Sequence, residues 1–208
     1  TTTAVSIIVD LSGSMGAVDS NNIKRIDVAS QCAYAIATAV ERSNCDVEVV
    51  GFGGSDDKAG AASPRDMAGV DGSSGSGSGG QRYGQAKLFD IKPFNVKAAL
   101  CRRTFQLLRF MTCFCTPDYH SVRTVTESLN QRTQQRKIVI VLTDGLGDSD
   151  KMLEFTKFSS RVYKLPVLGI GIQTQPFHMR QAYDNFVIVD SLKELSETAI
   201  RTLITQIK

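Results

Sequence analysis

The sequence predicts an α/β fold, a three-layer sandwich in which helices cover both faces of a mainly parallel central sheet with one short antiparallel edge strand. Two observations predict this class. Short apolar runs alternate with segments of helical periodicity along the chain. The first run, "AVSIIV" (4–9), is rich in β-branched and apolar residues on both of its faces. Such a run is typical of a central parallel strand that is covered by helices on each side.

Six strands are expected, each a short apolar run between polar or glycine-containing segments. The third follows the second after a long polar excursion, and we expect it to return beside the second strand as the short edge strand. In chain order the strands are expected at residues 4–9, 47–53, 86–91, 137–145, 165–172 and 186–190.

Five helices are expected between and after these strands. In the first, apolar residues recur at three- and four-residue steps from Ile26 to Val40. Pro93 and Pro117 each open a helix, because proline is favoured in the first turn. The first of these two would place Val96, Leu100, Leu107, Leu108 and Met111 on its apolar side. The last two helices are expected at residues 148–164, with Asp148 or Ser149 as N-cap, and at 191–208.

The length of 208 residues favours a single domain, residues 1–208. Residues 54–85 are rich in glycine, serine and aspartate and predict a flexible loop rather than a domain boundary. Within it, "SSGSGSGG" (73–80) resembles an engineered linker that replaces a longer native loop; a natural Ser/Gly loop is the alternative. The net charge of +3 is small, and nothing resembles a nucleic-acid-binding arm.

The cysteines and the apolar runs bear on the cellular compartment. The chain has five cysteines, an odd number, without a paired framework. It has no secretory apolar region and no run long enough to cross a bilayer. Together these features predict a cytoplasmic protein without a membrane partner.

The stretch "SIIVDLSGSMG" (6–16) suggests a metal site. Its apolar strand ends at Asp10, and Ser12 and Ser14 follow at alternate positions. Alternate residues of an extended segment point to the same side, so one carboxylate and two hydroxyls would face one way. Such an oxygen cluster suits a hard divalent cation, Mg²⁺ or Mn²⁺. The alternative is structural: aspartate and serine also cap helices and form turns.

Further ligands are expected from two other loops, because one loop cannot complete an octahedral site. Thr116 in "TPD" and Asp144 in "LTDG" each begin a loop between a core element and the next helix. In open α/β sheets ligands bind beyond the carboxyl ends of the strands, where both Asp10 and Asp144 fall.

The motifs "DLSGSMG", "TPD" and "LTDG" on an alternating α/β chain resemble the von Willebrand factor type A (VWA) domain, a Rossmann-like sandwich. In that family the three loops form the metal-ion-dependent adhesion site (MIDAS). The resemblance implies that Ser12, Ser14 and Thr116 supply hydroxyl ligands and that Asp10 and Asp144 coordinate directly or through water. The implied cofactor is Mg²⁺, with Mn²⁺ or Ca²⁺ as alternatives.

Within this family, "SIIVDLSGSMG", "QQRKIVIVLTDG" and "VLGIGI" look like the C-terminal VWA domain of cobaltochelatase CobT-like proteins. The likeness implies an adaptor that binds a partner's Asp or Glu through the metal and works with a MoxR/CobS-type AAA+ ATPase. A first alternative is a subunit of an ATP-dependent cobalt or magnesium chelatase in cobalamin-type tetrapyrrole biosynthesis.

A second alternative is a metal-dependent hydrolase. Against it, the chain has no Gly-x-x-x-x-Gly-Lys-Ser/Thr loop for a nucleotide. Its two histidines lie in different segments, His120 on an expected surface helix and His178 in an expected loop. We therefore expect a non-catalytic module. Phe105, Phe110 and Phe114 surround a helix end and are expected in the core, with an exposed subset as a partner surface.

Overall fold

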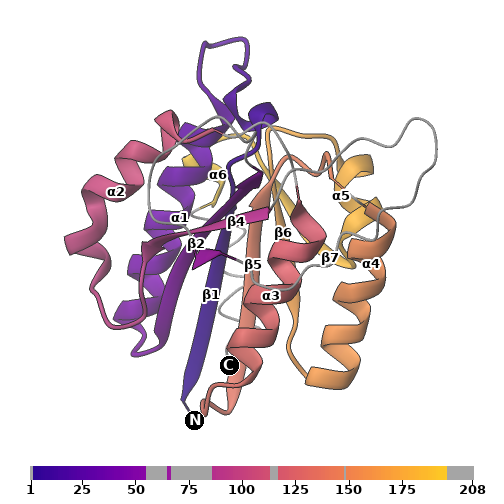
Figure 1. Cartoon of the computed structure of the whole chain (residues 1–208). Helices are drawn as coiled ribbons and strands as arrows, with labels where there is room; N and C mark the ends of the chain where they lie inside the picture. The colour runs from indigo at the N-terminus through magenta and orange to yellow at the C-terminus, as the bar shows by residue number, and fades with distance from the viewer. Residues whose placement is uncertain (1, 55–64, 67–85, 113–116, 148, 196–208) are drawn as a thin grey trace.

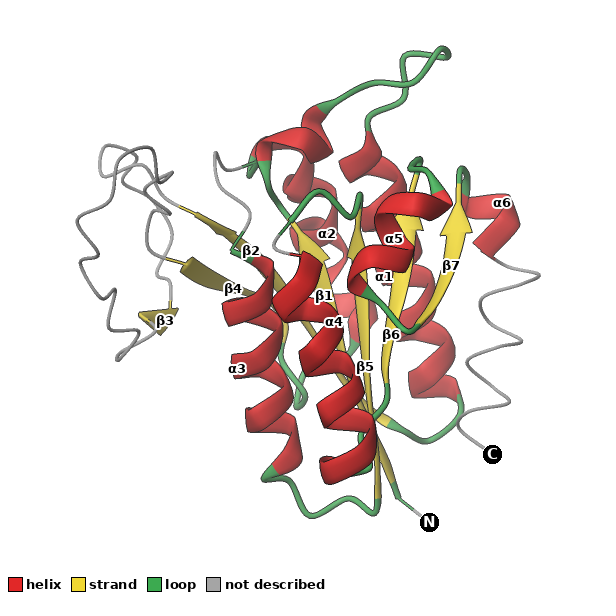
Figure 2. Ribbon diagram, turned by 90° about the vertical axis from the view of Figure 1, so that its right-hand side faces the viewer, coloured by secondary structure: helices red, strands yellow, loops and turns green. Residues whose placement is uncertain are grey.

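The computed structural model describes residues 2–54, 65–66, 86–112, 117–147 and 149–195 (Figure 1). These residues form one sheet with helices packed on both of its faces, which confirms the predicted three-layer sandwich (Figure 2). Most of the expected helix at 191–208 lies outside the described residues.

The strands lie close to their predicted positions. β1, β2, β5, β6 and β7 pair in parallel, and β4 runs antiparallel to β2, as expected. In spatial order the strands are β3 (Arg65–Asp66), β4 (Ala86–Lys92), β2 (Asp46–Gly54), β1 (Thr3–Asp10), β5 (Arg136–Thr143), β6 (Val167–Ile172) and β7 (Asn185–Val189).

Two residues of the excursion at 54–85 form the short strand β3, which the sequence did not predict. It pairs antiparallel with β4, so the sheet extends one short strand beyond the expected edge. Polar residues can join a sheet in this way because an edge strand offers unpaired backbone groups to any neighbouring segment.

The helices divide between the two faces of the sheet. α1, α2 and Leu195, the residue that follows α6, contribute to the core on one face, and α3, α4 and α5 to the core on the other. Their bounds are α1 (Arg25–Arg42), α2 (Arg102–Leu107), α3 (Asp118–Asn130), α4 (Ser149–Phe158), α5 (Pro176–Ala182) and α6 (Leu192–Glu194). Shorter turns are the 3₁₀ segments η1 (Gly13–Gly16), η2 (Ala98–Cys101) and η3 (Leu108–Phe110), and the π segment η4 (Ser159–Tyr163).

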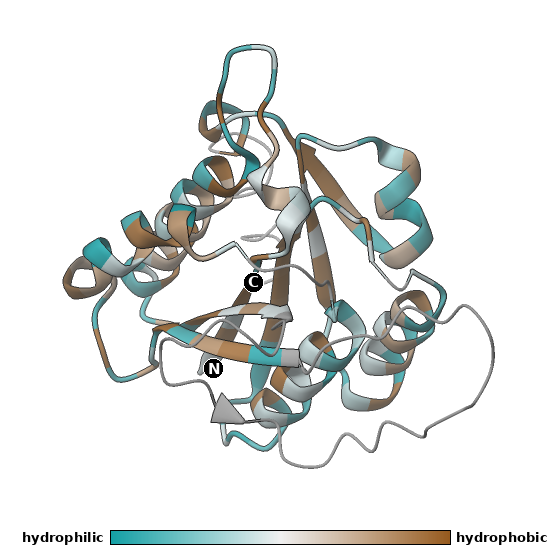
Figure 3. Cartoon of the chain, turned by 45° about the horizontal axis from the view of Figure 1, so that its top comes forward, coloured by the Kyte–Doolittle hydropathy of each residue, from teal (hydrophilic) through white to brown (hydrophobic). Residues whose placement is uncertain are grey.

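The hydropathy of the chain follows this layering. The central strands are almost continuously apolar, whereas the helices alternate apolar and polar residues along their length (Figure 3). Every residue of β1 and β6 is buried, as expected for strands covered on both faces. No helix among the described residues has the length and apolar character needed to cross a bilayer.

The helix predicted to open at Pro93 is wrong in its start and in part of its apolar face. Leu108 is buried and Val96 and Met111 pack against the core, as expected, whereas Leu100 and Leu107 do not. Helical structure begins only at Ala98 and consists of η2, α2 and η3 in succession. The residues that point to the core follow the spacing 101, 105 and 108, so the expected core leucines at 100 and 107 are exposed. The buried residues are Cys101, Phe105 and Leu108, and the exposed ones are Leu100, Leu107 and Phe110.

A further correction concerns His178, which was expected in a loop. It lies in α5, a short helix that begins at Pro176. Proline in the first turn has no N–H to leave unpaired and its fixed φ fits the helix, so Pro176 was the available sequence signal.

Candidate metal centre

The centre lies where β1 and β5 end side by side. Val9 of β1 is paired with Leu142 of β5 in the parallel register, so the next residues of the two strands meet at the same edge. This register places Asp10, the last residue of β1, beside Thr143, the last residue of β5. Asp144 follows Thr143 directly in the chain. The predicted convergence of the two aspartate loops therefore follows from the parallel pairing of β1 with β5.

Asp10 is fully buried and held by hydrogen bonds from both sides. The backbone N–H of Ser12 donates to Oδ1 across 2.8 Å, and the hydroxyl of Thr143 donates to Oδ2 across 2.7 Å. Thr143 Oγ1 in turn accepts a bond of 3.1 Å from the N–H of Gly145. The carboxylate is thereby fixed at the mouth of the sheet.

The loop after Asp10 brings the two serines together. Their Oγ atoms are 3.1 Å apart, with Ser12 fully buried and Ser14 half-buried. The turn of η1 is closed by a hydrogen bond from the N–H of Met15 to the carbonyl of Ser12. The Met15 side chain is completely buried in the core and anchors this turn.

Asp144 contributes the second buried carboxylate. Its Oδ1 accepts a 3.2 Å bond from the N–H of Leu146, and its Oδ2 accepts a 3.1 Å bond from Nη1 of Arg25. The hydroxyl of Thr174 donates to the backbone carbonyl of Asp144 across 2.6 Å. Residues from the loop after β5, from α1 and from the loop after β6 therefore fix this side chain and its backbone.

The surroundings of Asp10 disfavour its charged form. Burial, and to a lesser degree the nearby charge of Asp144, raise the pKa of Asp10 from 3.8 to about 7. The hydrogen bonds from Ser12 and Thr143 act in the opposite direction. Two buried carboxylates with one arginine in contact form a site to which a cation would bring charge balance.

A third acidic residue, Asp118, lies close to this edge. Its side chain is buried at the start of α3, and its Oδ1 accepts a 2.8 Å bond from the N–H of Tyr119. A Cβ added to Gly147, three residues after Asp144, would lie 1.9 Å from Asp118 Oδ2. The loop after β5 therefore packs directly on the first turn of α3.

The hydroxyl of Tyr183 is buried without a hydrogen-bond partner in the part of the chain that the structure describes. Its pKa is raised well above the usual value by burial and by the charges of Asp118 and Asp10. The negative potential of the centre therefore reaches into the core beneath it.

The structure brings four of the sequence-predicted residues to one edge of the sheet: Asp10, Ser12, Ser14 and Asp144. Thr116 lies outside the described residues. The sequence patterns did not indicate the contacts of Thr143, Arg25 and Asp118 around these four residues. Thr143 precedes Asp144 and Asp118 belongs to "TPD", so both had a positional signal; Arg25 had none.

The two histidines differ in their distance from this centre. His120 is exposed on α3, as predicted. His178 lies next to the loop that carries Asp144, although the two are far apart in the sequence. A Cβ added to Gly145 would be 3.2 Å from the Cβ of His178.

The donor set fits a hard divalent cation. Two carboxylates and two serine hydroxyls are oxygen donors, which suit Mg²⁺ better than softer metals. No group of three or more His, Cys, Asp or Glu side chains within the described residues could hold a metal. A cation at this edge would therefore depend on the serine hydroxyls.

Similar solved structures define the class of fold. BatB from Bacteroides thetaiotaomicron is 13% identical, with a TM-score of 0.67 over 98% of each chain. The PilB minor pilin from Streptococcus sanguinis is 15% identical, with a TM-score of 0.64 over 99% of this chain and 61% of that one. An aerotolerance-related membrane protein from Bacteroides fragilis is 14% identical, with a TM-score of 0.63 over 98% of each. At these identities the likeness shows the fold alone, which is VWA-like.

The sequence also identifies the family within this class. The family described as "Cobalamin biosynthesis protein CobT VWA domain" matches residues 1–207. The chain therefore belongs to the CobT VWA domain family, as the sequence motifs predicted. No curated protein matches the sequence.

Proposed function

We propose that this domain is a Mg²⁺-dependent protein–protein interaction module that binds a carboxylate of its partner through a MIDAS. The observation that carries the proposal is the convergence of Asp10, Ser12, Ser14 and Asp144 from the ends of β1 and β5. Thr116 would complete the protein's ligand set.

In this proposal the metal supplies electrophilic attraction for one anionic oxygen of the partner. The residues of the chain would hold and orient this metal. Ser12 and Ser14 would present hydroxyls from a turn anchored by Met15, and Thr143 would orient Asp10. Because these residues come from loops fixed by the sheet, they would hold the cation at the edge of the sheet, where a partner protein could reach it.

The partner that the family favours is a MoxR/CobS-type AAA+ ATPase. Membership of the CobT VWA family supports this choice. The family's description also supports a second role, as a subunit of an ATP-dependent chelatase in cobalamin-type tetrapyrrole biosynthesis. In both roles the chain itself would be non-catalytic and would act by holding the partner.

The test measures Mg²⁺ binding by calorimetry and binding of the cognate AAA+ ATPase by interferometry, in Mg²⁺ and in EDTA. The variant is Asp10→Asn, because an amide replaces a carboxyl group whose burial already favours its neutral form. The matched control is Asp150→Asn, an exposed aspartate in the first turn of α4. We expect Asp10→Asn to lose both interactions and Asp150→Asn to keep both.

The proposal is wrong if the wild type binds no Mg²⁺, or if Asp10→Asn binds the ATPase as tightly as the wild type. Release of phosphate from ATP by the isolated domain in Mg²⁺ would instead favour the hydrolase. In that case His178, beside Gly145, would be the first residue to replace.

A further inference from the structure

An exposed apolar ridge runs along η2, α2 and η3. Three large apolar residues of this segment face solvent: Leu100 is 79% exposed, Leu107 45% and Phe110 77%. Their spacing of seven and three residues places them on one side of the segment, because the intervening Phe105 and Leu108 are buried in the core. We call these three side chains the ridge. Isolated exposed leucines need no explanation, but three on one short segment form a patch.

The charged residues of the segment that carries the ridge are all basic. Residues 91–112 contain no aspartate or glutamate. Their exposed basic residues are Lys97, Arg102, Arg103 and Arg109. Arg109 pairs with Asp27 of α1 across 3.2 Å. Neither Arg102 nor Arg103 has a hydrogen-bonding or ionic partner among the described residues. Exposed arginines beside exposed leucines suit an acidic, apolar segment of another protein.

The ridge leads to the candidate metal centre. α2 lies on the outer side of α1 and rises toward the edge where β1 ends (Figure 1). At the end of this rise, Thr112 comes next to η1: a Cβ on Gly16 would lie 3.9 Å from Thr112 Cγ2. The Arg109–Asp27 pair ties η3 to the first turn of α1, next to Arg25. One partner could therefore contact the ridge and the metal together.

We propose that the ridge docks an acidic, apolar segment of the same protein partner whose carboxylate reaches the metal. The proposal rests on the proposed function for the metal-bound carboxylate, while the chemistry of the ridge stands on exposure and charge. Leu100, Leu107 and Phe110 would pack against apolar side chains of the segment. Arg102 and Arg103 would pair with its acidic residues.

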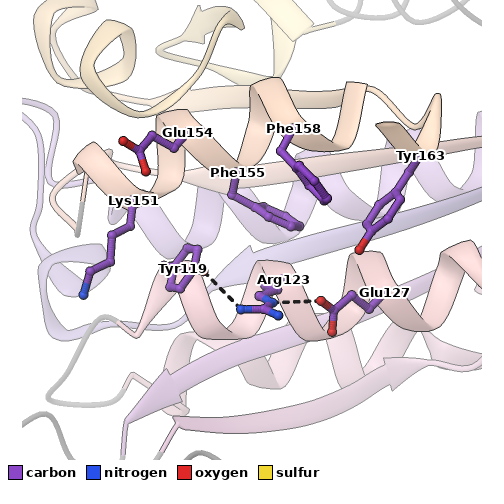
Figure 4. A pocket seen from close by; sticks show the side chains of 8 residues that line it. All are labelled: Tyr119, Arg123, Glu127, Lys151, Glu154, Phe155, Phe158 and Tyr163. Carbon is purple, nitrogen blue, oxygen red and sulfur yellow. Dashed lines mark hydrogen bonds and ion pairs between the residues drawn. The ribbon is translucent and has the colours of Figure 1, made fainter. Parts of the chain in front are cut away.

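A groove on the other face of the sheet provides a contrast. It has a volume of about 320 Å³ between α3 and α4 (Figure 4). Its lining carries two basic and two acidic side chains: Arg123, Lys151, Glu127 and Glu154. Arg123 donates to Glu127 across 2.8 Å and to the hydroxyl of Tyr119 across 3.3 Å. The groove therefore shows no preference for a charged partner, whereas the ridge does.

The test selects phage-displayed random peptides on the wild-type domain in Mg²⁺ and counter-selects on Leu107→Ser/Phe110→Ser. Both replaced side chains are exposed, so the fold should persist. We expect the enriched peptides to combine Asp or Glu with large apolar residues. Their Kd, measured by fluorescence anisotropy, should rise roughly tenfold or more in the serine variant and in Arg102→Glu/Arg103→Glu. The matched control is Val162→Ser, which replaces an exposed apolar residue on η4 and should leave Kd unchanged.

Three results would overturn the proposal: no peptide is enriched, the enriched peptides lack acidic residues, or they bind the ridge variants as well as the wild type. Binding of wild type but not the ridge variants to phosphatidylserine-containing vesicles would assign the ridge to membranes and also overturn it. Asp10→Asn separates the two proposals. Peptide binding that is lost in the ridge variants but kept in Asp10→Asn supports the ridge proposal and counts against capture of a carboxylate by the metal. Peptide binding that is lost in Asp10→Asn but kept in the ridge variants overturns the ridge proposal alone.

Discussion

Nη1 of Arg25 donates a 3.1 Å hydrogen bond to Oδ2 of Asp144, although 119 positions separate the two residues. The same Nη1 lies 3.4 Å from the carbonyl oxygen of Ser14. The Asp144 side chain is fully buried, and that of Arg25 is only 24% exposed. A fixed positive charge therefore contacts two of the residues that would surround the metal, and it bears on how tightly the centre can hold a cation.

We predict that Arg25→Met binds Mg²⁺ more tightly than the wild type. Methionine keeps the unbranched stem and removes the charge that repels the metal and occupies Asp144. Two unit charges about 4 Å apart interact with about 1 kcal/mol in water and about 4 kcal/mol at an effective dielectric constant near 20. Removing the charge of Arg25 should therefore lower the Kd for Mg²⁺ by about fivefold or more. Calorimetry with Mg²⁺ measures the difference.

The matched control for this change is Arg109→Met. Arg109 also pairs with an aspartate of α1, Asp27, but its side chain is half exposed and lies outside the centre. Its replacement should leave the Kd for Mg²⁺ unchanged. Weaker Mg²⁺ binding by Arg25→Met would contradict the prediction and show that Arg25 organises Asp144 for the metal.

A second prediction concerns Thr143, the hydrogen-bond donor to Asp10. Thr143→Val preserves the shape but leaves the buried Oδ2 of Asp10 without this donor. We expect the free energy of unfolding in EDTA to fall by about 1–3 kcal/mol, measured by urea denaturation. Thr143→Ser should recover most of the loss. The control is Thr126→Val, which removes a buried hydroxyl that donates only to the carbonyl of Val122 within α3. An equal loss of unfolding free energy in Thr126→Val would mean that the hydrogen bond to Asp10 stabilises the fold no more than an ordinary buried hydroxyl does.

Sequence patterns were sufficient to predict six of the seven strands, all but β3, and the ends of β1 and β5. Continuous apolar runs predicted the buried strands, and parallel pairing then placed Asp10 and Asp144 at one edge. The patterns failed where long-range contacts decide the outcome. The Arg25–Asp144 pair joins distant segments and leaves no periodic signal. Leu100 and Leu107 fit a helical repeat, but Phe105 and Leu108 occupy the core-facing side instead.

A third prediction concerns the pH dependence of stability without metal. The pKa of Asp10 is about 7 in the folded chain, above its value of 3.8 when unfolded. The folded state therefore holds the proton more tightly, and this contribution to stability is complete below the unfolded pKa. It decreases as pH rises toward 7, by at most about 1.4 kcal/mol per pH unit.

The measurement is urea denaturation in EDTA across this pH range, for the wild type and Asp10→Asn. Asparagine does not titrate, so the wild type should lose more stability than the variant as pH rises. Saturating Mg²⁺ should remove this difference in slope from the wild type, because the cation takes the place of the proton. Equal slopes in EDTA for both proteins would contradict the assignment.

The last prediction tests the contact between the loop after β5 and the start of α3. Gly147→Ala would bring a Cβ to 1.9 Å from Oδ2 of Asp118, a buried side chain with little freedom to move. Either the loop or the carboxylate must shift, and we expect a loss of about 1–3 kcal/mol in the free energy of unfolding. Gly16→Ala is the control, because the nearest atom to its added Cβ is 3.9 Å away, an ordinary contact. Urea denaturation of both variants measures the effect. Equal unfolding free energies of the two variants would show that the Asp118 side chain can move aside without loss of stability. The loop after β5 and α3 would then not be tightly packed there.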